Sequence, residues 1–314
     1  MKKTSKSALN VQFDLRAAKQ VERRMIVDTL QRLAQAQFPI RDYKYTGMGS
    51  IHFVDFVIFH RLLGIDDMLS VEHDSTLEDR VKFNRPFKCI KTKMCSATDV
   101  IPTLSQDEKH LLWLDYDEPV TSEILNDVFL AGSQLSTGSI LVVTVDVEPP
   151  DKVSDNLYAS KAYFEREARK YLSSIDDKDF AEGNLHKTSK RVIINALKEG
   201  MAGRTGINYY PLFFFVYADG HRMMTVGGII GSKVEKRKIN SMDIEGATYL
   251  RMNIDSAAYE IKIPVLTRKE RQLLDSAMPC DAGWQPKEFA VPANDIEAYR
   301  EIYRFFPAYA ELLL

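Results

Sequence analysis

A glycine turn followed by an acidic strand end is the first pattern in this sequence that could do chemistry. In the stretch YKYTGMGS, Gly47, Gly49 and Ser50 come between a short aromatic run and the apolar run IHFVDFVIFHRLLG, which is typical of a helix. Two glycines permit a tight turn and a close approach of a ligand to the backbone, and a helix N-terminus supplies N–H groups that bind anions.

The next strand-like segment ends in VEHD, where Glu72 could accept hydrogen bonds from ribose hydroxyls. Together the turn and this acid favour a nucleotide-like cofactor. The alternative is a turn that binds nothing, since Gly-x-Gly also occurs in such loops.

The elements that must position these residues alternate between strand-like and helical runs. The strand-like runs are YKY, DMLSVEHD, PFKCIKTKMC, HLLWLDY and SILVVTVDV, followed by two more in NYYPLFFFVYADGHRMMTVGGIIG. Helical segments of ten or more residues between strands indicate crossover connections, and Asp-Gly inside the last segment is typical of a hairpin turn. The sequence therefore predicts an α/β fold with a mostly parallel sheet of about seven strands that ends in an antiparallel hairpin. Ligands bind such sheets at the carboxyl ends of the strands.

Three parts are expected along the chain: an N-terminal helical extension over 1–38, the sheet domain over 39–232, and a helical appendage over 233–314 that packs on the core. The N-terminal helix carries Arg16, Lys19 and Arg23 on one face. This basic stripe could hold a phosphate or a carboxylate, or it could be a solvated face. The N-terminal helix or the C-terminal appendage is also where a second copy or another protein partner is expected.

Composition and charge indicate neither a nucleic-acid partner nor a membrane span, and they favour a cytoplasmic protein. The formal net charge of -2 gives no overall attraction to nucleic acid, and no run of about 18 apolar residues predicts a membrane span. Cys89, Cys95 and Cys280 show no metal-ligand spacing, which favours reduced thiols used for packing in a cytoplasmic protein.

The order of these features resembles the class I S-adenosylmethionine-dependent methyltransferases, over residues 40–232. The resemblance implies a Rossmann-like domain that binds S-adenosylmethionine. In such a match Gly47, Gly49 and Ser50 line the methionine moiety and Glu72 binds ribose. The resemblance also places Ser96 and Asp99 beside adenine. Two positions depart from the pattern, because Tyr45 and Ser96 stand where the family often has carboxylates.

The acidic strand ends imply the rest of the site. Asp115 and Asp117 follow one strand and Asp146 follows the next, and the resemblance puts these ends side by side. Asp115 and Asp146 could hold Mg²⁺, which would bind a hydroxyl acceptor and favour its deprotonated form. In the alternative, the acids cap a helix or face solvent. Of the histidines near the expected pocket, His73 is the best candidate base, so Asp115, Asp117 and His73 are the expected catalytic residues.

The leading hypothesis is a methyltransferase that acts on a hydroxyl acceptor, since LDYDEP lacks the Asn/Asp-Pro-Pro-Tyr/Phe pattern of enzymes that methylate DNA bases on nitrogen. A second is a methyltransferase-like nucleotide-binding or scaffold protein without turnover, which works through a partner. A third, a dehydrogenase, ranks last because the third glycine of GxGxxG is missing.

Overall fold

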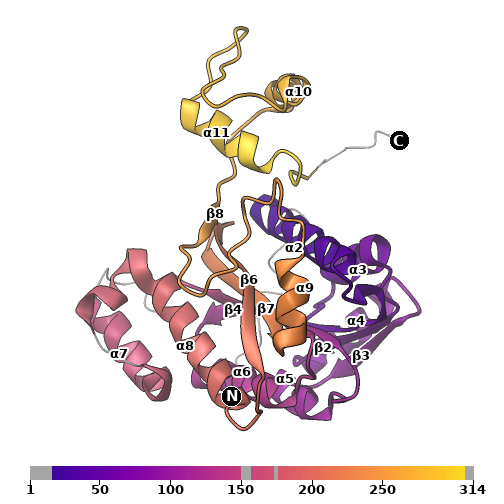
Figure 1. Ribbon diagram of the computed structural model, residues 1–314. Helices are drawn as coiled ribbons and strands as arrows, with labels where there is room; N and C mark the ends of the chain where they lie inside the picture. Colours follow the sequence, from indigo (N-terminus) through magenta and orange to yellow (C-terminus); the bar gives the residue numbers. More distant parts are fainter. Residues whose placement is uncertain (1–15, 150–156, 173–175, 308–314) are drawn as a thin grey trace.

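The computed structural model describes residues 16–149, 157–172 and 176–307, which form an α/β structure around an eight-stranded sheet (Figure 1). The strand order is β3-β2-β1-β4-β5-β7-β6-β8. The first five strands are parallel, and β7 runs antiparallel to both of its neighbours. The strands are β1 Lys44–Gly47, β2 Asp67–Glu72, β3 Ile90–Met94, β4 His110–Pro119, β5 Ser139–Asp146, β6 Asn208–Ala218, β7 Arg222–Gly231 and β8 Tyr259–Ile261.

Helices cover both faces of the sheet. One apolar cluster joins one face to α2, α3, α4 and α9, and a second joins the other face to α5, α6, α7 and α8. The helices are α2 Ala17–Gln35, α3 Val54–Leu63, α4 Glu78–Asn84, α5 Ala97–Val100, α6 Ser122–Gln134, α7 Leu157–Glu167, α8 Leu185–Met201, α9 Lys233–Asn240, α10 Arg268–Ala277 and α11 Ala293–Ile302. The expected α/β fold, its parallel sheet and its terminal hairpin are confirmed.

The two ends of the described chain relate differently to this sheet. Helix α2 lies against it, with most of its residues buried, whereas α10 and α11 project away from it (Figure 1). Between these ends, α9 packs on the sheet and β8 adds an eighth strand parallel to β6. Within 233–261, β8 thus extends the sheet and α9 covers one of its faces.

The hairpin turn between β6 and β7 holds the start of α2. The N-cap residue of α2, Arg16, makes no side-chain cap, so the first N–H groups of the helix need another acceptor. Asp219 in the turn supplies it, because its carboxylate accepts the N–H groups of Ala18 at 3.1 Å and Lys19 at 2.8 Å. This contact fixes α2 above the ends of the central strands.

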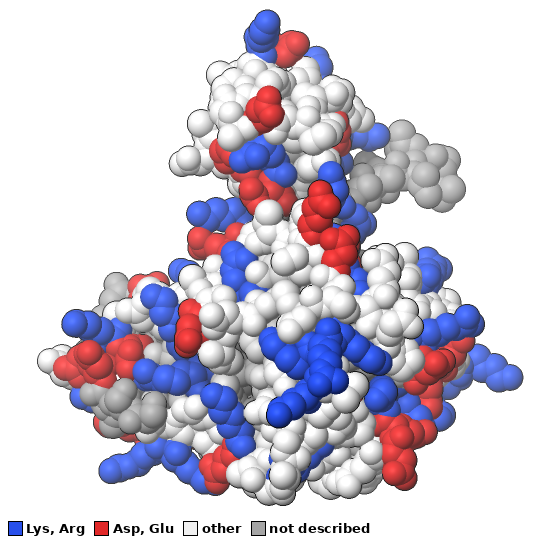
Figure 2. Space-filling model, in the orientation of Figure 1, with Lys and Arg blue, Asp and Glu red and all other residues white. Residues whose placement is uncertain are grey.

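The surface gathers lysine and arginine side chains over α9 (Figure 2). The remaining charges on this face are dispersed and of both signs. None of the helices in the described part of the chain is long and apolar enough to cross a membrane.

Candidate functional site

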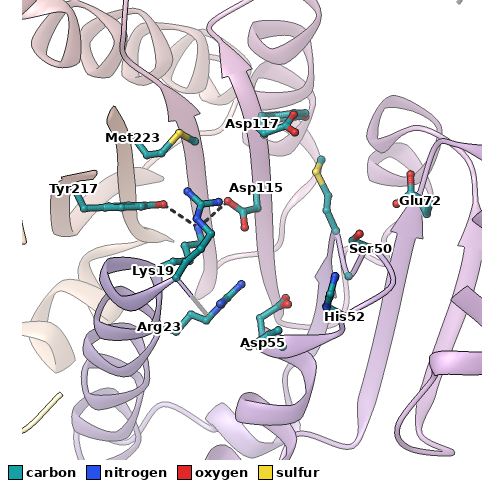
Figure 3. A pocket seen from close by; sticks show the side chains of 15 residues that line it. Lys19, Arg23, Ser50, His52, Asp55, Glu72, Asp115, Asp117, Tyr217 and Met223 are labelled. Atoms are coloured by element: carbon teal, nitrogen blue, oxygen red, sulfur yellow. Dashed lines mark hydrogen bonds and ion pairs between the residues drawn. The ribbon is translucent and has the colours of Figure 1, made fainter. Parts of the chain in front are cut away.

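A pocket opens where the carboxyl ends of β1, β2 and β4 meet α2 (Figure 3). This is the edge of the sheet at which the sequence predicts ligand binding. The lining residues are Arg16, Lys19, Arg23, Met48, Gly49, Ser50, His52, Val54, Asp55, Glu72, Asp115, Tyr116, Asp117, Tyr217 and Met223. Five of the predicted site residues are therefore brought together here: Gly49, Ser50, Glu72, Asp115 and Asp117.

The glycines of the turn are required by their neighbours in the core. A Cβ atom at Gly47 would overlap the Tyr45 hydroxyl, and one at Gly49 would lie 2.5 Å from Ser70 Oγ and 2.9 Å from the Phe56 ring. At both positions the added Cβ atom would meet neighbouring side chains rather than empty space in the pocket. Packing alone therefore explains why both positions are glycine.

Ser50, next in the turn, differs from the glycines. Its backbone is left-handed, with φ of 48°, and its hydroxyl oxygen is buried without a hydrogen-bond partner among the described residues. Buried polar atoms are nearly always hydrogen-bonded, so an unpartnered one that lines a pocket fits a missing ligand. The cofactor contact of Ser50 stays a prediction.

Tyr45, one of the two positions at which the sequence departs from the pattern of the family it resembles, contacts a carboxylate. It lies fully within the core, and its hydroxyl donates a hydrogen bond to the Asp55 carboxylate on α3. Burial raises the pKa of Asp55, and the nearby charge of Arg23 opposes that rise. Asp55 lines the pocket although Tyr45 does not, so α3 places a carboxylic acid beside the end of β1.

Glu72 lies at the end of β2, on the opposite side of the pocket from Tyr217 (Figure 3). Its side chain is nearly buried, and one oxygen accepts the N–H of Asp74 at 2.9 Å. The neighbouring His73 lies 3.4 Å from the same oxygen but is largely exposed and does not line the pocket. The structure therefore gives His73 no position from which it reaches the pocket interior.

Ser96 and Asp99 form a capping box at the start of α5. Ser96 Oγ accepts the N–H of Asp99, and Asp99 accepts both the N–H and the hydroxyl of Ser96. The two side chains are hydrogen-bonded to each other, with Ser96 half-buried and Asp99 exposed, and neither lines the pocket. Their adenine contact stays a prediction.

Lys19 has several charged and hydrogen-bonding partners in the pocket, although it was not among the expected catalytic or cofactor-binding residues. Lys19 is almost fully buried, and its Nζ lies 2.8 Å from Asp115, 2.9 Å from Glu22 and 3.1 Å from the Tyr217 hydroxyl. It also lies over the Trp113 ring, 4.7 Å from the ring centre. Burial by itself would lower the pKa of Lys19, but the carboxylates of Asp115 and Glu22 outweigh burial and raise it above its ordinary value. Lys19 is therefore a fixed positive charge.

This group continues into the sheet through hydrogen bonds. Glu22 accepts the hydroxyl of Thr225, which contacts Thr144 at 2.8 Å, and Thr144 in turn accepts the Trp113 indole N–H at 3.0 Å. The sequence signal for it was the basic stripe of the N-terminal helix. Of the two readings of that stripe, the solvated face is wrong for Lys19 and Arg23, which are buried.

The two residues expected to share Mg²⁺ have different partners. Asp115 is paired with Lys19, whereas Asp146 contacts His221 at 3.3 Å and belongs to a separate cluster with Glu148. Asp146 does not line the pocket, and in the described part of the chain no contact brings Asp115 and Asp146 together around one ion.

The strand order, with its terminal hairpin and its pocket at the ends of β1, β2 and β4, is that of the class I S-adenosylmethionine-dependent methyltransferases. The chain belongs to the family described as "Putative O-methyltransferase", whose model matches residues 11–314. The sequence matches no curated protein.

Solved structures with similar folds are distant in sequence. Trm1 from Pyrococcus horikoshii, in complex with S-adenosyl-L-methionine, is 12% identical, with a TM-score of 0.46 over 83% of this chain and 71% of that one. The O-methyltransferase TomG from Streptomyces achromogenes, in complex with SAM, is 13% identical, with a TM-score of 0.36 over 72% of this chain and 94% of that one. Fibrillarin from Methanococcus jannaschii is 13% identical, with a TM-score of 0.35 over 62% and 70%.

Proposed function

We propose that this protein transfers the methyl group of S-adenosylmethionine to a hydroxyl group of an acceptor. One observation carries the proposal: the buried, unpartnered hydroxyl of Ser50 lines the same pocket as Glu72 and the carboxylate of Asp117. The pocket thus offers polar groups for a cofactor on one side and a proton acceptor on the other. Family membership is consistent with this assignment.

The cofactor side is formed by the turn after β1 and the end of β2. Ser50 would donate its hydroxyl to the methionine part, and Glu72 would accept the ribose hydroxyls. Because one Glu72 oxygen is held by the N–H of Asp74, its carboxylate is oriented before the ligand arrives. Such preorganisation reduces the entropy lost on binding.

The acceptor side is formed by α2 and the end of β4. S-adenosylmethionine supplies an electrophilic methyl group, so the protein needs only to position the acceptor oxygen in line and to accept its proton. Asp117 is exposed within the pocket lining and is assigned as that base. With the cofactor bound, Asp117 would take up the proton that the acceptor hydroxyl loses as its oxygen receives the methyl group in exchange for the sulfur.

Asp115 has a different assignment. One of its carboxylate oxygens is paired with the Lys19 ammonium group at 2.8 Å, so this oxygen faces α2 rather than an acceptor. We assign Asp115 to positioning: it ties α2 to β4 and so shapes the acceptor side.

Calorimetry with S-adenosylhomocysteine tests the cofactor side directly. Glu72→Ala should weaken binding by at least about tenfold, the equivalent of ~1.4 kcal/mol for lost hydrogen bonds to a charged group. Glu182→Ala, which removes an exposed glutamate outside the pocket, is the matched control and should bind as the wild type does.

Transfer of a labelled methyl group to catechol and simple phenols then tests turnover. Absence of binding in the wild type would reject the cofactor assignment. Binding without transfer to any hydroxyl compound would favour the scaffold hypothesis over catalysis.

A further inference from the structure

Three side chains outside the pocket bring one potential metal-ligand atom each close together. Asp146 ends β5, Glu148 follows it, and His221 lies in the turn between β6 and β7. His221 Nδ1 lies 3.3 Å from Asp146 Oδ2 and 3.1 Å from Glu148 Oε2, and the three atoms lie within 4.8 Å of one another. We propose that this cluster binds a divalent first-row transition metal such as Zn²⁺ or Mn²⁺. The proposal does not depend on methyl transfer.

The distances suit three ligands on one ion. Zinc–nitrogen and zinc–oxygen bonds of roughly 2.0 to 2.2 Å, at angles between 90° and 109°, separate neighbouring ligand atoms by about 2.8 to 3.6 Å. The two separations from His221 Nδ1 fall in this range. A metal held by His221 and either carboxylate needs little movement of these side chains, and the two carboxylate oxygens lie within 4.8 Å of each other.

Backbone hydrogen bonds already orient both carboxylates. Asp146 Oδ1 accepts the N–H of Glu148 at 2.7 Å, and Glu148 Oε1 accepts the N–H of Arg222 at 3.0 Å. In each case the other oxygen is the one that faces His221. Outer hydrogen bonds of this kind fix metal ligands in place in known sites.

A second cluster of similar composition differs in the hydrogen bond that its histidine makes. His60, Asp66 and Cys89 also place their ligand atoms close together. His60 Nδ1, however, lies 3.0 Å from the carbonyl oxygen of Ile65, so this nitrogen carries a proton and cannot bind a metal. No contact of His221 Nδ1 with a backbone carbonyl is found in the described residues, and its neighbours are carboxylates.

One imidazole and two carboxylates also indicate the kind of metal. Imidazole suits zinc and its neighbours, whereas Mg²⁺ prefers oxygen ligands and retained water. Three protein ligands leave a position for water or another group. The ion would tie the end of β5 to the turn whose Asp219 holds the start of α2.

The competing interpretation is an ion cluster without metal, in which a protonated His221 pairs with both acids. The two differ in what happens when metal is added at pH 7.5, because metal binding needs the neutral imidazole. We would strip the full chain with chelator and titrate it calorimetrically with Zn²⁺, Mn²⁺ and Mg²⁺. The wild type should bind one Zn²⁺ per chain at this site, with Mg²⁺ failing to compete at equal concentration.

His221→Ala decides the assignment, with His60→Ala as the matched control. His221 is about half exposed in a turn, so its removal should leave the fold intact, as circular dichroism would verify. Loss of this ligand should weaken Zn²⁺ binding by at least about 100-fold, the upper range for mutations of outer partners. His60→Ala should bind as the wild type does. If the wild type binds no Zn²⁺, or if His221→Ala binds it with unchanged affinity, the proposal is overturned.

Discussion

Helix α2, near the start of the chain, and helices α10 and α11, near its end, differ in whether their charged residues are buried. Helix α2 buries Lys19, Glu22 and Arg23 between itself and the strands, where each finds partners of opposite charge or hydrogen-bonding groups. Helices α10 and α11 stand away from the sheet and keep most of their charged residues in contact with solvent (Figure 1). Helix α2 therefore contributes residues to the pocket, whereas α10 and α11 do not line it.

The difference follows from what burial demands. A buried charge is tolerated only with a partner, and removing that partner leaves an uncompensated charge. The charges of α2 therefore specify its position on the sheet, since Lys19 is satisfied only where Asp115 and Tyr217 meet. The links from the last segment to the body are sparser, such as the Arg24 hydrogen bond of 3.0 Å to the Phe306 carbonyl.

The largest expected effect comes from Lys19→Met. The change leaves Asp115 and the buried Glu22 without their cation, and should lower the free energy of unfolding by about 3 kcal/mol. Urea denaturation, followed by Trp113 fluorescence in a Trp284→Phe background, measures it. Lys269→Met, at an exposed position of α10, should change the free energy by less than about 0.5 kcal/mol. Equal effects of the two substitutions would remove the distinction between the helices.

A pH dependence should follow from Asp55, which faces Arg23 of α2. Its folded-state pKa is raised above the ordinary value of 3.8, because burial disfavours the charged form. The folded state thus holds this proton more tightly than the unfolded state, and stability is lost as pH rises from about 3.8 through the raised pKa. Relative to Asp55→Asn, the wild type should lose about 1.4 kcal/mol per pH unit in that window.

Glu297 on α11 provides the opposite case. The N–H of Gly283 and the charge of Arg300 lower its pKa, so its contribution is present above the ordinary value and is lost as pH falls. Urea midpoints of wild type, Asp55→Asn and Glu297→Gln between pH 3 and 8 should give difference curves of opposite slope. A flat curve for Asp55→Asn would show that its burial has no effect on protonation.

The smallest expected change in the free energy of unfolding comes from removing the acceptors at the N-termini of helices α2 and α10. Asp219→Ala removes the acceptor for the first N–H groups of α2 and should cost about 1 kcal/mol, as an N-cap does. Thr267→Ala removes the N-cap of α10, a change of the same kind. In the Trp284→Phe background, only Asp219→Ala should shift the Trp113 transition. A comparable shift from Thr267→Ala would mean that α10 unfolds together with the sheet.

The sequence was sufficient to predict the sheet, because strand-like runs and turn residues are local signals. Alternating runs gave the parallel strands, and Asp219-Gly220 gave the hairpin. The positions of Gly49 and Glu72 followed from the rule that ligands bind at the strand ends. The short strand β8 was missed, since three residues at a sheet edge carry too little pattern to detect.

Pairings across long stretches of sequence were beyond local patterns. Lys19 meets Asp115 and Tyr217 only because α2 folds back over β4 and β6. The link between Asp146 and His221 likewise requires β5 and β7 to be neighbours. The basic stripe of Arg16, Lys19 and Arg23 on the N-terminal helix indicated a charged face but not its partners.

The packing of the glycine turn limits what its presence reveals about descent. Gly49 is held by contacts with Ser70 and Phe56 in the core, so selection for a stable fold would preserve it whether or not catalysis was also under selection. A descendant that had lost its chemistry would keep the turn unchanged. Ser50, whose hydroxyl has no partner in the described structure, would be free to drift, and its identity is the better record of an ancestral ligand.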